Sequence, residues 1–152
     1  MDELRMDFES KQFIVVKFDE EQYGIDIKYI DNIVRMQRIT RVPKVQNYFK
    51  GVINLRGEII PVMSIRLKMG LEEDVITKAT RIIIIKMEGN DAVGLLVDEV
   101  LEVVTLSSNQ IERVVYDSKE EKANFIFGVG KDKNGLISLM DLNLVLADTE
   151  TV

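Results

Sequence analysis

The sequence predicts an all-β protein with short helices, built from two small closed sheets of about five strands each. Most of the apolar residues fall in short β-branched or aromatic runs of strand length. Tight-turn dipeptides such as Arg56-Gly57 and Asn134-Gly135 separate several of these runs. Two stretches of the first half also recur in the second half, in the same order. Many short strands at close spacing are typical of small barrels or of a sandwich.

The clearest strands are the segments 12–18 (QFIVVKF) and 81–87 (RIIIIKM). Both of their faces are apolar, so each is expected to be buried on both sides. Acidic residues follow each segment and indicate hairpin turns. The other expected strands span 22–27, 51–55, 58–63, 92–104, 125–131 and 135–140.

Helical signals are confined to two places. Apolar residues recur at helical spacing between Ile27 and Val34, which predicts about two turns of helix over 28–35. Asp141 is expected to cap a short helix through 142–148.

The two prolines predict interruptions of strands. Pro43 follows Arg41-Val42, which a following proline biases toward extended backbone, so it is expected to end a strand. Pro61 lies inside 58–63 and has no N–H, which predicts an edge strand or a bulge there.

The internal repeat relates two pairs of segments. Residues 13–27 resemble residues 82–97, and residues 51–65 resemble residues 128–142 without a gap. The repeat predicts a two-lobed architecture, because one alternating run matches many strands by chance but ordered matches do not.

One domain over 1–152 is expected, with two lobes that fold as a unit. The N-terminal lobe is expected mainly from about 13–65, and the second lobe mainly from about 82–142. Since each lobe alone is small, the two are expected to share a continuous apolar interface.

The composition excludes several function classes. The 152 residues include no Cys and no His, which excludes disulfides, Cys- or His-ligated metals and His-based catalysis. With 20 Lys and Arg against 26 Asp and Glu, the net charge is −6, and the basic residues read as scattered. No nucleic-acid partner is therefore expected.

The location expected from the sequence is the cytoplasm. The N-terminus MDELRMDFES lacks the apolar stretch of a signal peptide. No apolar run approaches the roughly 20 residues that a membrane span needs.

The hairpin tip at Asn54-Leu55-Arg56-Gly57 is the most distinctive candidate site. One interpretation is an ordinary turn, with Gly57 at positive φ and Arg56 in solvent. The other is that a rigid hairpin presents Arg56 to a partner protein, since arginine is enriched at interface hot spots. The repeat places Lys133 at the same point of a more polar second tip, so the apolar Leu55 beside the arginine distinguishes the first.

Catalytic candidates are weaker. Asp98, Glu99 and Glu102 could serve as paired carboxylates in a small enzyme. Strand alternation, however, places the adjacent Asp98 and Glu99 on opposite faces. The tract Gly128-Val129-Gly130-Lys131 lacks the pattern of a phosphate-binding loop. We expect no enzyme, no catalytic residue, no cofactor and no metal.

The residues carry a resemblance to the CheW family, the coupling proteins of bacterial chemotaxis. The resembling segments are QFIVVKFDEEQYGIDI, TRVPKVQNYFKGVINLRGEIIPVMSI and VGLLVDEVLEVVTL, and the similarity extends from about Gln12 to about Asp148. The motif at 51–57, followed by Ile59-Ile60-Pro61-Val62, is specific to this family and to the related regulatory domain of the kinase CheA.

The resemblance implies two intertwined five-stranded SH3-like β-barrels in pseudo-repeat. It implies a non-enzymatic adaptor that couples the cytoplasmic tips of methyl-accepting chemotaxis receptors to the regulatory domain of CheA. The expected location is cytoplasmic, at the inner face of the membrane through receptor arrays.

The resemblance also implies a receptor- and kinase-binding set. Arg56 matches the family's functional arginine, and Ile30 and Val34 match apolar positions that line its receptor groove. Asn32 stands where many relatives have Glu, which weakens the expectation of a carboxylate pair with Arg56. Asn54 and Leu55 complete the set.

Two further alternatives have a related fold. A detached CheA-type regulatory domain would share the motif, but the start at Met1 and the short acidic tail favour a stand-alone protein. An oligonucleotide-binding barrel would need basic and aromatic residues on one face, and the sequence shows no such face.

Overall fold

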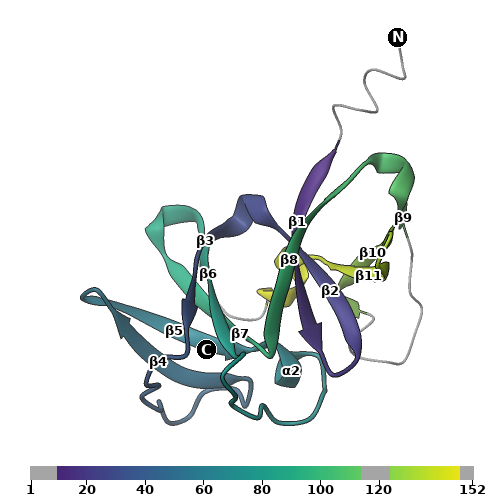
Figure 1. The fold of residues 1–152 in the computed structure, drawn as a ribbon. Coiled ribbons are helices and arrows are strands. Elements are labelled where there is room, and N and C mark those ends of the chain that lie inside the picture. Colours follow the sequence, from purple (N-terminus) through teal and green to yellow (C-terminus); the bar gives the residue numbers. More distant parts are fainter. Residues whose placement is uncertain (1–9, 114–123, 148–152) are drawn as a thin grey trace.

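The computed structural model describes residues 10–113 and 124–147, whose strands form two sheets set side by side (Figure 1). The larger sheet has six strands in the order β8-β1-β2-β11-β10-β9, and the smaller has five in the order β3-β6-β7-β5-β4. The predicted all-β class, with two SH3-like sheets and few short helices, is confirmed.

Most of the predicted strands lie within one or two residues of the observed bounds. The strands are β1 (Lys11–Phe18), β2 (Glu21–Asp26), β3 (Ile30–Arg35), β4 (Phe49–Leu55), β5 (Glu58–Ser64), β6 (Arg81–Lys86), β7 (Ala92–Val97), β8 (Glu99–Leu106), β9 (Ile111–Arg113), β10 (Ile126–Asp132) and β11 (Gly135–Met140). The short helices are η1 (Ile27–Tyr29), α2 (Ile65–Lys68), η2 (Glu88–Asn90), η3 (Ser108–Gln110) and α3 (Leu142–Val145).

Side-chain alternation along the strands sorts the core into three clusters. In β1, Ile14 and Val16 face a core shared by the two sheets, whereas Phe13 and Val15 face the interior of the larger sheet. β6 alternates in the same way between the shared core and the interior of the smaller sheet. The described residues thus include the apolar interface that the repeat predicted.

The sequence repeats correspond to repeated hairpins, but each sheet contains both copies. The first copy supplies β1–β2 and β4–β5, and the second supplies β6–β7 and β10–β11. Parallel pairing joins β2 to β11 and β7 to β5. Gly24 lies opposite Leu139 and Gly94 opposite Val62, and these two pairs are equivalent in the sequence repeat. The first hairpin of each copy is thus exchanged onto the second hairpin of the other.

The ranges of about 13–65 and 82–142 therefore supply most, but not all, of each sheet: three of the five strands of the smaller sheet and four of the six strands of the larger one. Sequence similarity identifies which segments are alike, but the same residues would serve pairing within a copy or between copies, as in a domain swap. The repeat therefore predicts the alike segments, and the structure adds which of them pair.

The segment 28–35 contains the strand β3 and not the predicted helix, and η1 is the only helical turn described beside it. β3 pairs with β6, and a bulge between Ile30 and Asn32 shifts the register. The bulge adds one residue, so Ile30 and Ile33, three positions apart, both contact the shared core. This spacing imitates a helical face, which explains the wrong prediction.

Two other predicted elements differ in extent. The predicted strand 92–104 is divided, because the chain passes from the smaller sheet to the larger one at Asp98. The C-terminal helix is present as α3, where the Asp141 carboxylate accepts two backbone N–H groups. Of its predicted span, residue 148 lies outside the described residues.

The prolines only partly match their predictions. β5 lies between β7 and β4, so an edge position for Pro61 is wrong, although a bulge in β4 lies next to its partner residues. Pairing with β7 begins at Val62, which leaves Pro61 paired on the β4 side alone. No described strand ends at Pro43: β3 ends at Arg35, and the nearest pairing is an isolated bridge between Thr40 and Val52.

Gly51 marks a close approach that recurs in the second sheet. Thr40 and Val52 exchange two backbone hydrogen bonds of 2.8 Å each. A Cβ at Gly51, whose φ is +139°, would lie 2.1 Å from the Thr40 carbonyl oxygen. A Cβ at the equivalent Gly128 would lie 2.9 Å from the Glu112 carbonyl oxygen, where β9 pairs with β10. The bridge in the smaller sheet is therefore the counterpart of β9 in the larger one.

Arg66 ties the crossing from β7 to β8 to the β1–β2 turn. It lies in α2 and is only 6% exposed. Its Nη1 donates to Asp98 at 2.7 Å and its Nη2 to Asp19 at 3.1 Å, while Nε donates to the Glu72 carbonyl at 2.8 Å. Asp98 lies at the crossing from β7 to β8, and Asp19 in the β1–β2 turn, so one guanidinium fixes both. A buried charge is tolerated only with such partners.

Asp74 supports the helix that carries this arginine. The Ser64 hydroxyl accepts the Leu67 N–H at 3.1 Å, which caps α2, and donates to Asp74 at 2.5 Å. The other carboxylate oxygen of Asp74 is buried without a hydrogen-bond partner among the described residues. Burial raises the pKa of Asp74, against the lowering effect of the Ser64 hydrogen bond.

Gly51→Ala should lower the free energy of unfolding by about 3 kcal/mol, because the added methyl meets backbone at a positive φ. Gly57→Ala is the matched control: its φ is also positive, +83°, but no described atom lies within 4 Å of the new Cβ. We expect a loss of about 1 kcal/mol there. Urea unfolding followed by circular dichroism measures both, and equal losses would contradict the close approach at Thr40.

Asp74→Asn should make stability less dependent on pH. A raised folded pKa means that the folded chain holds the proton more tightly, so stability falls as pH rises above the unfolded value of about 4. The asparagine side chain does not titrate, so the variant does not lose stability in this way as pH rises. Its free energy of unfolding relative to wild type should therefore be greater at about pH 7 than at about pH 4. A difference that stays constant across this range would show that the carboxyl group does not titrate abnormally.

Candidate functional site

The candidate Arg56 lies at the tip of the β4–β5 hairpin. Leu55 and Glu58 form its last pair and leave Arg56-Gly57 as a two-residue turn, with φ values of +55° and +83°. Positive φ at both positions is typical of a type I′ turn, whose twist matches that of the flanking strands. The Asn54 side chain accepts the Gly57 N–H at 3.0 Å and fixes the turn. The arginine is thus held in a backbone conformation that non-glycine residues seldom adopt.

The Arg56 side chain is exposed and forms no ion pair with any described residue. Ile59, beside it, is 60% exposed, so the tip presents a cation next to apolar surface. The equivalent tip of β10–β11 has Lys133 and the 63% exposed Leu136. The two tips therefore share an exposed apolar residue. They differ where Leu55 is replaced by Asp132.

The second part of the predicted site lies on β3. Ile30 is half-buried and contacts the shared core, whereas Val34 contacts the interior of the smaller sheet, as Leu55 does. The bulge in β3 thus separates Ile30 and Val34, which a helix would have placed on one face. Asn32 is half-buried, and its Oδ1 is buried with no hydrogen-bond partner in the described chain.

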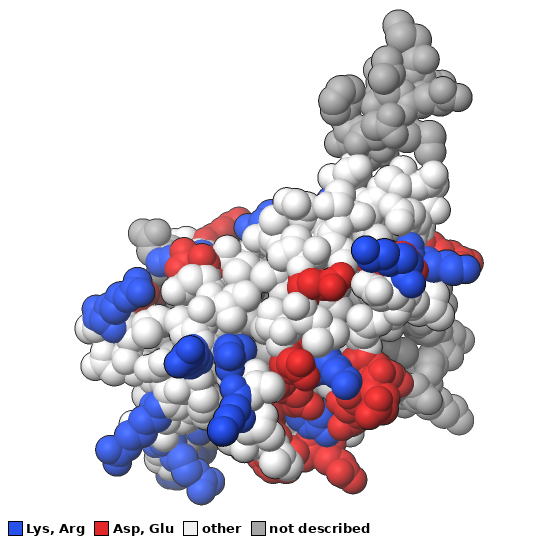
Figure 2. Space-filling view, viewed as in Figure 1, with Lys and Arg blue, Asp and Glu red and all other residues white. Residues whose placement is uncertain are grey.

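Charge is distributed very unevenly over the molecule. Residues 35–56 contain six Lys or Arg and no Asp or Glu, so they carry +6. The other residues then carry 14 − 26 = −12. In Figure 2, basic side chains gather over the smaller sheet and acidic ones around α2 and the β1–β2 turn. The expectation of scattered basic residues is therefore wrong, because a chain-wide count averages over two regions of opposite sign.

The paired-carboxylate alternative finds no support in the geometry. Asp98 is bound to Arg66, while Glu102 accepts a hydrogen bond from Asn134 at 3.2 Å. The two carboxylates thus have different partners in different parts of the fold. Across the described ranges, no group of three or more His, Cys, Asp or Glu residues could hold a metal ion. Within the same ranges, no helix is long and apolar enough to cross a membrane.

Sequence reasoning missed Arg66 and the basic segment that leads into β4. The signal for the basic segment was available, since no acidic residue interrupts 35–56. Nothing in the sequence singles out Arg66, because its partners Asp19 and Asp98 lie far from it along the chain.

Comparisons with known proteins agree with this fold. The CheW-like domain model matches residues 12–150. Chemotaxis protein CheW of Bacillus subtilis is 36% identical over 136 residues, covering 90% of this chain and 86% of that protein. The Helicobacter pylori CheW is 32% identical over 135 residues, covering 89% and 81%.

A solved structure extends the comparison to three dimensions. It is the crystal structure of the scaffolding protein TtCheW from Thermoanaerobacter tengcongensis, with a TM-score of 0.80 and 33% identity. The match covers 90% of this chain and 92% of that one. Since the family model, relatives above 30% identity and a solved fold all span most of the sequence, the chain belongs to the CheW family.

Proposed function

We propose that this chain is a non-enzymatic adaptor that couples the cytoplasmic tips of methyl-accepting chemotaxis receptors to the regulatory domain of the histidine kinase CheA. Membership in the CheW family supports a role as a chemotaxis scaffold. The observation that carries the proposal is Arg56, exposed, without an ion pair among the described residues, and held on a rigid hairpin tip. Because the hairpin is already ordered, little loop entropy is lost when a partner binds this arginine.

Arg56 acts, on this proposal, through a carboxylate or backbone carbonyl of a partner helix. Its guanidinium offers several N–H donors in a fixed fork, which suits either acceptor. Leu55 and Asn54 contribute in different ways. Leu55 anchors the tip to the interior of the smaller sheet, and Asn54 closes the turn. The arginine therefore meets its partner in one orientation.

We place the receptor helix where the shared core approaches the surface along β3. Tyr29, Ile30 and Ile33 are half-buried there and pack against that core. A helix with an apolar face would bury their remaining exposed surface. Asn32 lies between Ile30 and Ile33 and is half-buried, so its side chain would border the docked helix. Val34 supports the strand from inside the smaller sheet.

The binding residues of this proposal lie on more than one strand of the smaller sheet. β3 and β4 lie at opposite ends of its strand order, so Ile30 and the Arg56 tip do not share a strand pair. One adaptor of 152 residues, folded as a single CheW-like domain, would thus bind two proteins at once. We propose that it works in the cytoplasm, at the inner face of the membrane, through the receptors that recruit it.

Arg56→Ala should weaken receptor binding or kinase coupling by about tenfold or more, as expected for an arginine hot spot. Its unfolding midpoint should stay close to wild type, because the side chain is exposed. Co-sedimentation with receptor fragments and CheA measures the assembly.

Lys133→Ala is the control, because Lys133 occupies the same turn position in the β10–β11 hairpin. It removes the same charge and should leave assembly unchanged. Undiminished ternary assembly by Arg56→Ala, or an equal loss from both variants, would contradict the assignment of the first tip.

A further inference from the structure

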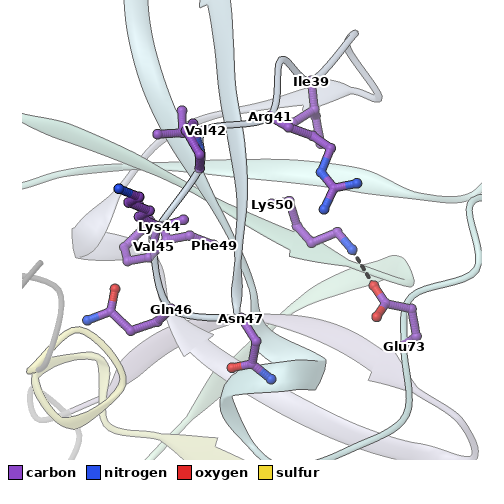
Figure 3. Close-up of a pocket in the computed structure, with 11 residues that line it drawn as sticks. Ile39, Arg41, Val42, Lys44, Val45, Gln46, Asn47, Phe49, Lys50 and Glu73 are labelled. Carbon is purple, nitrogen blue, oxygen red and sulfur yellow. Dashed lines mark hydrogen bonds and ion pairs between the residues drawn. The ribbon is translucent and has the colours of Figure 1, made fainter.

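A cavity of about 700 Å³ lies beside the segment that leads into β4 (Figure 3). Residues between Ile39 and Lys50 form most of its lining, and Glu73 closes one side. Lys50 is near the start of β4 and Arg56 just beyond its end, six positions away. An extended strand spans roughly 20 Å over that length. The cavity is therefore separate from the hairpin tip.

Cations dominate the lining of this cavity. Lys50 forms an ion pair with Glu73, and the Arg41 guanidinium points toward this pair (Figure 3). Arg41 and Lys44 are exposed and form no ion pair within the described ranges. Three cations thus face one carboxylate, which leaves a local charge of 3 − 1 = +2. Two of the cations remain available to bind an anionic group.

The same cavity also offers apolar and hydrogen-bonding groups. Val42 is 40% exposed, and Val45 and Phe49 are half-buried beside it. Gln46 lines the cavity, and its Oε1 has no hydrogen-bond partner among the residues described. Lys44 has a φ of +63°, a backbone conformation that fixes the path of the loop. The cavity thus combines charged and apolar side chains, and the backbone conformation at Lys44 fixes how the loop presents them.

We propose that this cavity binds an extended acidic segment of a partner protein, with carboxylates on both sides of an apolar side chain. The carboxylates pair with Arg41 and Lys44, and the apolar side chain packs on Val42. The site is independent of the adaptor role assigned to Arg56.

The alternative occupant, a nucleic acid, fits less well. Its phosphates would approach a chain with a net charge of −6 and would meet Glu73 at the cavity. It would also leave the exposed Val42 without an apolar partner. A short peptide carries fewer negative charges than a run of phosphates and supplies an apolar side chain for Val42.

The test uses the full chain and a fluorescein-labelled peptide, GGEDLEDGG, measured by fluorescence anisotropy. Wild type should bind it saturably, with a Kd below about 1 mM. The amide counterpart GGQNLQNGG and a labelled decathymidylate should bind at least about tenfold more weakly. Amide chemical-shift changes on adding GGEDLEDGG to the ¹⁵N-labelled chain should concentrate at 39–50.

Paired variants separate a built site from general electrostatics. Arg41→Gln with Lys44→Gln should weaken peptide binding by about tenfold or more. Lys131→Gln with Lys133→Gln changes the net charge equally, from −6 to −8, at exposed positions near the β10–β11 tip, and should have little effect. Absent saturable binding, equal binding of the amide peptide, tighter binding of the oligonucleotide, or equal loss in both variants would each overturn the proposal.

Discussion

Parallel pairing between the exchanged hairpins, β2 with β11 and β7 with β5, is the contact on which the rest of this structure depends. A glycine lies at the same point of each pairing. A Cβ at Gly24 would lie 2.9 Å from a Leu139 methyl, and a Cβ at Gly94 would lie 2.7 Å from an Ile82 methyl. Because the copies are exchanged, neither sheet can be completed by one half of the chain. The shared core, and the contacts of Arg66 with the β7–β8 crossing and the β1–β2 turn, follow from this arrangement.

The same pairing determines which parts of the smaller sheet project beyond the paired strands. β5 is held by β7 from Val62 onward, so the far end of the β4–β5 hairpin projects beyond that pairing with Arg56 at its tip. At the other end of β4, the bridge at Thr40 holds the basic segment against the sheet. One hairpin thus supports two separate surfaces, and its rigidity serves both.

The sequence predicted local structure better than it predicted which distant segments pair or contact one another. Strand bounds and the turn at Arg56 could be predicted, because β-branched runs and turn residues act over a few positions. The helix over 28–35 was wrong because a bulge is invisible to periodicity, and the same bulge separated Ile30 from Val34. The exchange of the first hairpins could not be predicted, because alike segments pair equally well within or between copies. Arg66 was missed because its carboxylate partners become neighbours only after the sheets have formed.

The two copies of the sequence repeat form hairpin tips, at β4–β5 and β10–β11, that are alike in backbone and different in charge. Both hairpin tips keep a cation and an exposed apolar residue, but Leu55 in one corresponds to Asp132 in the other. Residues 35–56 carry +6 and the remainder −12, so the smaller sheet and its surroundings have opposite polarity. Complementary potentials orient partners and reject wrong ones more than they raise affinity. In the proposed adaptor role, specificity would therefore come from where the charges lie on two similar sheets.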